Sequence, residues 1–305
     1  MTLSVVISAH NEEEMLKDCL ESVSWADEII FIDNESTDQT LRIAKKYTQK
    51  IFSRPNNPLM LNINKNFGCT KATGNWILSL DADERISKEL KGVMKGILHK
   101  PSTISHTPAG YLIPRKNIIF GKWIEHGLWY PDYQLRLFRN GKGKFPGKHN
   151  HELLEVKGKT EKLREPIIHY NYTSTNQYVK KIMDYYSDNE VDSFLESGKT
   201  IRWYDAIRMP ASDFLTNFFA REGYKDGLHG LVLSLLQAFY MFIVFVKIWE
   251  KQGFWEYQSA DFLQETKGEI ARKSKELGYW INKVRIENAP TAKKMLLKLK
   301  QKVYS

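Results

Sequence analysis

Short apolar runs recur through the N-terminal quarter of the chain and alternate with segments of helical character. The runs lie at Leu3–Ser8, Glu28–Asp33, Ile51–Phe52 and Trp76–Leu80, and β-branched residues are frequent in them. Continuous apolar runs of this length are typical of strands that are buried on both faces of a sheet. Strands that alternate with helices imply right-handed crossovers. The pattern therefore predicts an α/β fold with a Rossmann-like, mostly parallel sheet.

Polar residues are expected to set the ends of the intervening helices. Asn11 is placed to cap a helix whose first turn carries three glutamates, which suit the positive end of the helix dipole. Ser36 and Gln39 have the spacing of a capping box at the start of the next helix. Gly74 is expected to stop a helix predicted over residues 61–72.

From Asn176 onward the pattern is helical. Residues 228–246 are nearly uniformly apolar and lack Asp, Glu, Lys and Arg, and their length approaches that of a membrane span. Three polar side chains interrupt the run, and a lone span would place the two ends of the chain on opposite sides of a membrane. An interfacial helix, or a helix packed in a homodimer, is therefore favoured. We expect an α/β domain over residues 1–172 and a helical region over 173–305 that associates with a membrane or oligomerises.

The charge of the chain is concentrated at its end. The 305 residues are 42% hydrophobic and 27% charged, which excludes wholesale disorder and fibrous classes of protein. The net charge is +9, and Phe262–Ser305 carries 11 Lys and Arg against 4 Asp and Glu. Such an end suits an anionic partner, either nucleic acid or a membrane face, or else forms a solvated helical surface. Leu and Lys alternate at helical spacing over residues 293–302, as they do in helices bound at a membrane surface.

The two cysteines and the first residues bear on localisation. Cys19 and Cys69 match no metal-binding spacing, and the single disulfide that two cysteines could form would not hold together a fold of this size. No basic region followed by a long apolar core stands at the start, so no signal peptide is expected. The sequence predicts a cytoplasmic protein that attaches peripherally to the anionic surface of the inner membrane.

Polar clusters follow three of the predicted strands. They are Ala9–Glu12, Asp33–Ser36 and Asp81–Asp83. The carboxyl ends of parallel strands share one rim, and open α/β sheets bind ligands there. The loop after the first strand contains no glycine, so neither a dinucleotide fingerprint nor a phosphate-cradling loop is present. A phosphate at this rim would need another source of positive charge, and two aspartates can supply it by holding a divalent cation.

The pair Asp81 and Asp83 favours a metal site because of its context. The pair directly follows an apolar strand and is continued by Glu84, and three acidic residues at a strand end repel one another unless a cation is present. The alternative is a structural cap for the helix that begins near Ser87. Asp33, which ends the second strand on the same rim, is favoured as a ligand over an ordinary turn residue.

These motifs, in this order and spacing, resemble those of family 2 glycosyltransferases over roughly residues 1–100. They are Val5–Glu12, Ile32–Thr40, Asn66–Gly68, Ala72–Trp76 and Leu80–Asp83. The resemblance implies an inverting enzyme of the GT-A fold that uses a nucleotide-activated sugar such as a UDP-hexose. It implies that Asp81 and Asp83 hold Mn²⁺ or Mg²⁺ against the diphosphate. The residues implied in binding the nucleotide sugar are Ser8, Ala9, His10, Asn11, Glu12, Asp33, Asn66, Lys71, Asp81 and Ala82.

A second set of motifs extends the resemblance, less specifically, to about residue 250. An arginine-bearing run over Asp132–Arg139 is followed by His151–Glu152 and then by His169–Tyr170. This order is similar to that of the bacterial branch that builds lipopolysaccharide core and related cell-surface glycans. It implies a glycan or glycolipid acceptor.

An inverting transfer needs a carboxylate that takes the proton of the acceptor hydroxyl. Glu152 is slightly favoured over Asp132, and for either one the alternative is a salt bridge to a nearby cation. Arg136 is expected to neutralise the leaving diphosphate or to pair with Asp132. His169 either completes the metal site, as a late histidine does in some GT-A enzymes, or is a structural histidine.

Two other functions compete with this prediction. A polyprenyl-phosphate sugar transferase shares the N-terminal motifs, but its phosphate acceptor needs no general base. A nucleic-acid-binding protein would explain the basic end, yet it leaves the acidic strand-end clusters unexplained. We therefore expect a metal-dependent hexosyltransferase that does not bind nucleic acid.

Overall fold

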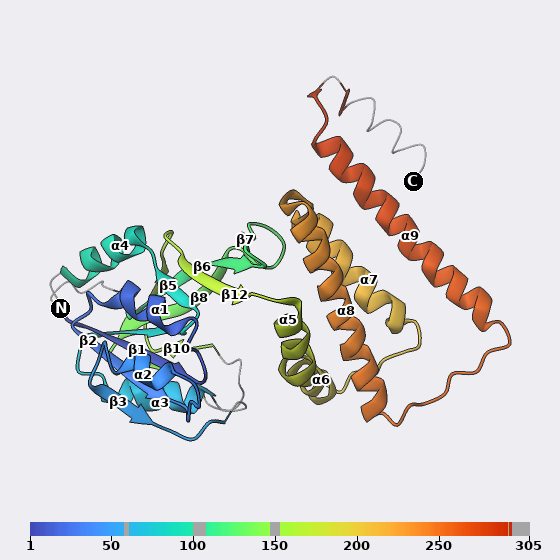
Figure 1. Ribbon diagram of the computed structural model, residues 1–305. Coiled ribbons are helices and arrows are strands. Elements are labelled where there is room, and N and C mark those ends of the chain that lie inside the picture. Colours follow the sequence, from blue (N-terminus) through green and yellow to red (C-terminus); the bar gives the residue numbers. More distant parts are fainter. Residues whose placement is uncertain (58–60, 100–107, 147–152, 292, 295–305) are drawn as a thin grey trace. The chain divides into compact units, whose positions relative to one another are not determined.

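The computed structural model describes residues 1–57, 61–99, 108–146, 153–291 and 293–294 (Figure 1). The chain divides into two compact units. The first comprises Met1–Ile119 and Trp129–Asn171, and the second comprises Phe120–Leu128 and Tyr172–Ser305. The short segment Phe120–Leu128, which no sequence pattern separates from its neighbours, thus belongs with the C-terminal helices.

The four predicted strands form the parallel half of the main sheet. They are β1 (Leu3–Ala9), β2 (Glu28–Asp33), β3 (Lys50–Ser53) and β4 (Trp76–Leu80). Their order is β3-β2-β1-β4, and β1 pairs in parallel with both β2 and β4. Their carboxyl ends therefore meet at one rim, as the sequence predicted.

The other half of the sheet comes from later in the chain. The strands are β5 (Glu84–Ile86), β6 (Gly110–Ile119), β8 (Asp132–Arg139), β11 (Thr160–Lys162) and β12 (Ile167–Tyr172). The short strand β7 (Lys122–Trp123) lies in the segment that belongs to the second unit. The pairs β4·β8, β6·β8 and β12·β5 are antiparallel, whereas β11 pairs in parallel with β6. The order continues from β4 through β8, β6 and β12 to β5. The strands β9 (Gly143–Lys144) and β10 (Glu155–Val156) make a separate two-stranded ladder. The sheet is thus mixed, with β8 antiparallel to β4.

Helices cover both faces of the parallel half, which explains its continuous apolar runs. The helices are α1 (Leu16–Val23), α2 (Thr40–Ala44), α3 (Leu61–Lys71) and α4 (Lys88–His99). Val5 and Ile7 pack in one cluster with residues of α1 and α4, whereas Val6 packs in a second cluster with residues of α3. Successive side chains of a strand point to opposite faces, so both faces need apolar residues.

The predicted caps at Asn11 and Ser36 are wrong. Helix α1 begins only at Leu16, and Asn11 has a left-handed backbone with φ of 53°. Thr37 N donates to the Asn11 side-chain oxygen at 2.8 Å, and Asn11 N donates to the Ser36 hydroxyl at 3.2 Å. Both polar side chains thus join the two rim loops to each other instead of capping helices.

Gly74 has a different role from the one predicted. Helix α3 ends at Lys71, close to the predicted end. A Cβ atom on Gly74 would lie 2.8 Å from the backbone N of Ser4, so only glycine lets the chain approach β1 here. Gly74 N donates to the Ser4 hydroxyl at 2.9 Å.

The second unit is helical, as predicted. Its elements are α5 (Thr175–Lys181), the π-helical segment η1 (Ile182–Tyr186), α6 (Ser187–Glu196), α7 (Asp205–Leu215), the π-helical segment η2 (Thr216–Ala220), the 3-10 segment η3 (Gly223–Asp226), α8 (Leu228–Lys251) and α9 (Phe262–Glu287). Within it, α8 packs against α6 and α7. The expected amphipathic helix at the end of the chain falls largely on residues 295–305, which lie outside the described residues.

Candidate active site

The loops after β1 and β2 are joined by a polar network at the rim. Asn34 is only 1% exposed, and its side chain donates to the Ser8 hydroxyl at 3.0 Å. The His10 ring donates through Nδ1 to the Asn34 carbonyl at 2.7 Å. Asn64 of α3 donates to the Asn34 side-chain oxygen at 2.8 Å. The structure thus gathers the predicted rim residues Ser8 and His10 around a buried asparagine.

Asp33 and Glu12 also lie in these loops. Asp33 is 4% exposed, and its Oδ1 accepts from Ser36 N at 3.3 Å. Glu12 N donates to the Thr40 hydroxyl at 2.7 Å. These bonds fix the shape of the two loops, so the rim at β1 and β2 is preorganised.

Asn34 and Asn64 were not singled out from the sequence. A signal for Asn64 exists, because α3 carries asparagine at positions 62, 64 and 66. Asparagine competes with the helical backbone for hydrogen bonds and is a poor helix former. Asparagines repeated within a helix therefore indicate that tertiary contacts use the side chains.

Asp81 is held by two cations of the chain itself. Lys65 Nζ lies 2.6 Å from its Oδ1, and Arg136 bonds its Oδ2. Burial alone would raise the pKa of Asp81, but Arg136 and Lys65 hold this pKa well below its ordinary value. Asp81 is therefore an ionised carboxylate with both oxygens engaged.

Glu84 shares the same arginine. Its side chain is fully buried, and its Oε1 lies 2.7 Å from Arg136 and 3.9 Å from Arg115. The prediction that the acidic cluster needs a cation holds, but arginine and lysine side chains supply the cations for Asp81 and Glu84. Arg136 pairs with these two residues rather than with Asp132, the partner considered from the sequence.

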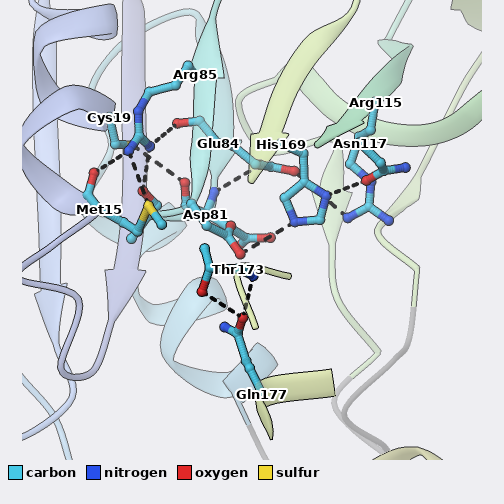
Figure 2. A network of polar contacts seen from close by, with 12 residues as sticks. Met15, Cys19, Asp81, Glu84, Arg85, Arg115, Asn117, His169, Thr173 and Gln177 are labelled. Atoms are coloured by element: carbon cyan, nitrogen blue, oxygen red, sulfur yellow. Dashed lines mark hydrogen bonds and ion pairs between the residues drawn. The ribbon is translucent and has the colours of Figure 1, made fainter. Parts of the chain in front are cut away.

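Asp83 faces His169 across the antiparallel pair β5 and β12. Strand β12 pairs with β5 so that His169 lies opposite Glu84, and Tyr170 N donates to the Asp83 carbonyl at 2.9 Å. The His169 Nε2 lies 3.4 Å from Asp83 Oδ2. The His169 Nδ1 lies 2.6 Å from Asn117 Oδ1 (Figure 2). The structure thus brings together two residues that are 86 positions apart and that were both predicted as metal ligands.

The donor types of Asp83 and His169 fit a divalent cation. A carboxylate oxygen and an imidazole nitrogen both bind Mn²⁺, and Mg²⁺ is commonly held by one or two carboxylates together with substrate phosphates. Among the described residues, no group of three His, Cys, Asp or Glu side chains gathers in a metal-binding arrangement. The described residues would therefore supply two donors, Asp83 and His169, and leave coordination positions for diphosphate oxygens and water.

Asp132 is engaged in an ion pair. Its Oδ2 accepts from Arg115 Nε at 2.7 Å, and its Oδ1 accepts from Gln134 Nε2 at 2.8 Å. Burial tends to raise the pKa of Asp132, but the Arg115 charge and these hydrogen bonds bring this pKa below its ordinary value. The salt-bridge alternative considered for Asp132 is thus the one that the structure displays. Glu152, the other candidate base, and His151 lie outside the described residues.

Lys71, Asn66 and Ala82 make contacts other than those expected. Lys71 is the last residue of α3, before the start of β4, and its Nζ lies 5.0 Å from the Phe67 ring centroid. A helix that leads into the start of a strand ends at the edge opposite the rim, so the structure does not support the contact of Lys71 with the nucleotide sugar that the resemblance implied. Asn66 exchanges two hydrogen bonds with the Phe145 backbone at 2.8 and 3.0 Å. The Ala82 carbonyl accepts from Arg85 at 2.7 Å.

Lys65, Arg115 and Asn117 were also missed from the sequence. Arg115 and Asn117 lie in β6, a strand that is otherwise largely apolar, and Asn117 is fully buried. A charged or amide side chain inside a buried strand must have a partner, and this is the signal that was available. Its partners come from distant parts of the chain, so the sequence did not name them.

Loss of the Arg136 side chain is expected to destabilise the fold. In Arg136→Met the carboxylates of Asp81 and Glu84 lose their shared cation, and breaking a buried pair in this way typically costs about 3–5 kcal/mol. The free energy of unfolding in urea measures the effect. Lys159→Met is the control, because the pair of Lys159 and Glu161 is exposed and should contribute less than about 1 kcal/mol. Equal stability of the two variants would contradict the expectation.

Comparisons with known proteins place the chain in a family. Residues 4–157, just over half of the chain, match the model of "Glycosyl transferase family 2". The chain is 27% identical over 263 residues to the lipopolysaccharide core biosynthesis glycosyltransferase LpsC of Rhizobium meliloti (strain 1021). This alignment covers 83% of this chain and 94% of LpsC.

Two solved structures are more distantly similar. Residues 1–349 of S. aureus TarS, in complex with UDP, give a TM-score of 0.42 at 15% identity over 86% of this chain and 95% of that chain. Mycobacterium tuberculosis glucosyl-3-phosphoglycerate synthase, in complex with Mn²⁺ and UDP-glucose, gives a TM-score of 0.30 at 23% identity over 38% and 43%. The mixed, mostly parallel sheet with its flanking helices is the predicted GT-A architecture. By the match to the family model, the chain belongs to glycosyltransferase family 2.

Proposed function

We propose that this protein is an inverting hexosyltransferase that moves a sugar from a UDP-hexose to a cell-surface glycan acceptor of the lipopolysaccharide core class. Membership of the family supports transfer from an activated sugar. The similarity to LpsC over most of both chains supports the acceptor class.

The observation that carries the proposal is the pair Asp83 and His169 beside the rim. Their facing atoms, 3.4 Å apart, are a carboxylate oxygen and a ring nitrogen, and both side chains are mostly buried. A Mn²⁺ or Mg²⁺ ion bound by them would neutralise the charge that develops on the diphosphate as the sugar leaves. Asp81, whose two oxygens are engaged by Lys65 and Arg136, is assigned the role of holding these two cations at the rim.

The rim at β1 and β2 is assigned to the nucleoside. The loop Ser8–Glu12 and Asp33 offer backbone and carboxylate groups to the base and ribose. The hydrogen bonds among Ser8, Asn34 and Asn64 fix these loops before the donor binds. A preformed site loses less conformational freedom when its ligand binds, which favours affinity.

Glu152 is the proposed general base. A base must accept a proton, and Asp132 is a poor acceptor because Arg115 and Gln134 occupy its two oxygens. Glu152 would take the proton of the acceptor hydroxyl while that oxygen attacks the anomeric carbon from the face opposite the diphosphate. This geometry inverts the configuration of the sugar.

A panel of nucleotide sugars tests the proposal. We expect UDP-hexoses, in the presence of Mn²⁺ or Mg²⁺, to be hydrolysed slowly and to raise the melting temperature more than GDP-, CDP- or dTDP-sugars do. EDTA should remove both effects. Absence of any response to nucleotide sugars, together with tight binding of a random oligonucleotide, would favour the nucleic-acid-binding alternative. Transfer to a polyprenyl phosphate by a Glu152→Gln variant at the wild-type rate would favour the polyprenyl-phosphate transferase.

Helix α8 is proposed as a site of peripheral attachment to the cytoplasmic face of the inner membrane. Among the described residues it is the one helix long and apolar enough to span a bilayer, with mean hydropathy 2.2. Only 28% of the apolar 18-residue stretch of this helix is buried inside the protein. Leu228, Leu235 and Phe239 are 71%, 52% and 45% exposed, and their spacing places them on one stripe of the helix. A glycolipid acceptor resides at such a surface, and a stripe of this kind suits the membrane interface.

Binding to vesicles should depend on both charge and apolar contact. Each cation near an anionic leaflet contributes about 1 kcal/mol, and the attraction decays within a Debye length of about 8 Å. We expect flotation with vesicles that contain anionic lipid to weaken in high salt and on deletion of residues 289–305. Hydrolysis of the soluble donor should persist in the deletion variant. If neither high salt nor the deletion weakened binding, α8 alone would make the contact with the vesicles. If the protein formed a stable dimer and bound no vesicles, α8 would instead pack against a second copy of the chain.

A further inference from the structure

The orientation of the Asn117 side chain is fixed by one backbone carbonyl. Asn117 lies in β6 and is fully buried. One end of its amide lies 2.6 Å from the Trp129 carbonyl oxygen. A carbonyl oxygen only accepts hydrogen bonds, so the Nδ2 group of Asn117 must face Trp129. The Oδ1 atom must therefore face the other way.

This orientation determines which nitrogen of His169 carries the hydrogen. Asn117 Oδ1 lies 2.6 Å from His169 Nδ1 (Figure 2). An amide oxygen only accepts, so Nδ1 is the donor. In the neutral ring Nε2 then holds the lone pair, and this atom faces Asp83 Oδ2 at 3.4 Å.

We infer that Asn117 is a positioning residue that selects the His169 tautomer whose Nε2 can bind a metal ion. The inference rests on the proposed function, because the ion that His169 would bind is the Mn²⁺ or Mg²⁺ proposed for sugar transfer. Asn117 acts on the ion through His169, and its side chain also hydrogen-bonds to Asp132. Residues of this kind commonly change metal affinity by about 10- to 100-fold when they are replaced.

Strand β6 thus supports both sides of the site. Arg115 and Asn117 are two residues apart and therefore lie on the same face of the strand. Arg115 holds Asp132, its partner in the register of β6 and β8, while Asn117 holds His169. A single strand positions both groups.

The tautomer can be measured without any metal. In protein labelled with ¹⁵N-histidine, long-range ¹H–¹⁵N spectra distinguish protonated from unprotonated ring nitrogens. His169→Gln identifies the His169 signals among those of the eight histidines. We expect Nδ1 of His169 to carry the hydrogen in the neutral ring of the wild type. A hydrogen on Nε2 of the neutral ring would overturn the inference, whatever the activity of the protein.

Metal affinity then tests the consequence. Titration with Mn²⁺ in the presence of UDP, followed by the loss of the free-ion paramagnetic resonance signal, should show about 10- to 100-fold weaker binding in Asn117→Leu. Asn117→Asp keeps an acceptor for Nδ1 and should remain within a few-fold of the wild type. Asn171→Leu is the matched control, because Asn171 is buried on the same face of β12 as His169. It should bind Mn²⁺ as the wild type does.

The outcomes separate this inference from the proposed function. Wild-type Mn²⁺ affinity in folded Asn117→Leu would overturn the role of Asn117 and leave the proposed reaction intact. Equal losses in Asn117→Leu and Asn171→Leu would also overturn it, because a general loss of packing would then explain both. If the wild type bound no Mn²⁺ with UDP, the proposed metal-dependent reaction would fail, and the spectra would still decide the tautomer.

Discussion

Asp83→Ala is expected to lower sugar transfer by more than about 100-fold, which is the usual size of the loss when major electrostatic stabilisation of a transition state is removed. The substitution removes the carboxylate that faces His169, while the ion pairs of Asp81 and Glu84 remain. The fold should therefore stay intact. Initial rates at saturating donor and Mn²⁺, compared with the wild type, measure the effect, and circular dichroism checks the fold.

A surface aspartate provides the control for this variant. Asp18 has a side chain that is 69% exposed, so Asp18→Ala should retain wild-type transfer. Titration with EDTA should reproduce the loss in the wild type and add nothing in Asp83→Ala. Full activity in EDTA, or in Asp83→Ala, would show that transfer does not use a metal at this place.

Glu152→Gln is expected to reduce kcat by about 100- to 10,000-fold, the range that a positioned general base commonly contributes. The amide is nearly the same size as the carboxylate but cannot take the proton of the acceptor hydroxyl. Donor binding should be unchanged, since the nucleotide is held by other residues. Single-turnover rates together with the UDP dissociation constant separate the two effects.

Asp132→Asn is the comparison that decides the assignment of the base. Because the Asp132 carboxylate is paired with Arg115, its replacement should mainly lower the free energy of unfolding. A strong loss of kcat in folded Asp132→Asn, with Glu152→Gln near wild type, would instead make Asp132 the base.

The sequence predicted that the rim loops are polar, but it did not predict which hydrogen bonds their side chains form. Asn11 and Ser36 have the composition of helix caps, and each has a competing partner in the other loop. Which bond forms depends on the parallel register of β1 and β2, which brings the two loops together. A cap is a local contact, and here a contact between loops 25 residues apart replaces it.

The antiparallel pairings of the sheet could likewise not be predicted from the sequence. Strand β8 carries Arg136 and Arg139 among its apolar residues, so its sequence has no continuous apolar run. Its pairing with β4 joins residues about sixty positions apart, and that pairing buries Arg136 beside Asp81 and Glu84. The positive charge that the acidic cluster requires is therefore supplied by Arg136, which comes from a distant strand.

By itself, the sequence determined the four parallel strands, the rim at their carboxyl ends and the acidic residues on it, because each of these follows from local periodicity and from the direction of parallel strands. Only the tertiary structure decided what those residues do with one another. It engaged Asp81 with Lys65 and Arg136, and it left Asp83 opposite His169. The physical reason is that the charge and hydrogen-bond partners of a buried group are set by proximity in space, and this proximity depends on pairings between strands far apart in the chain.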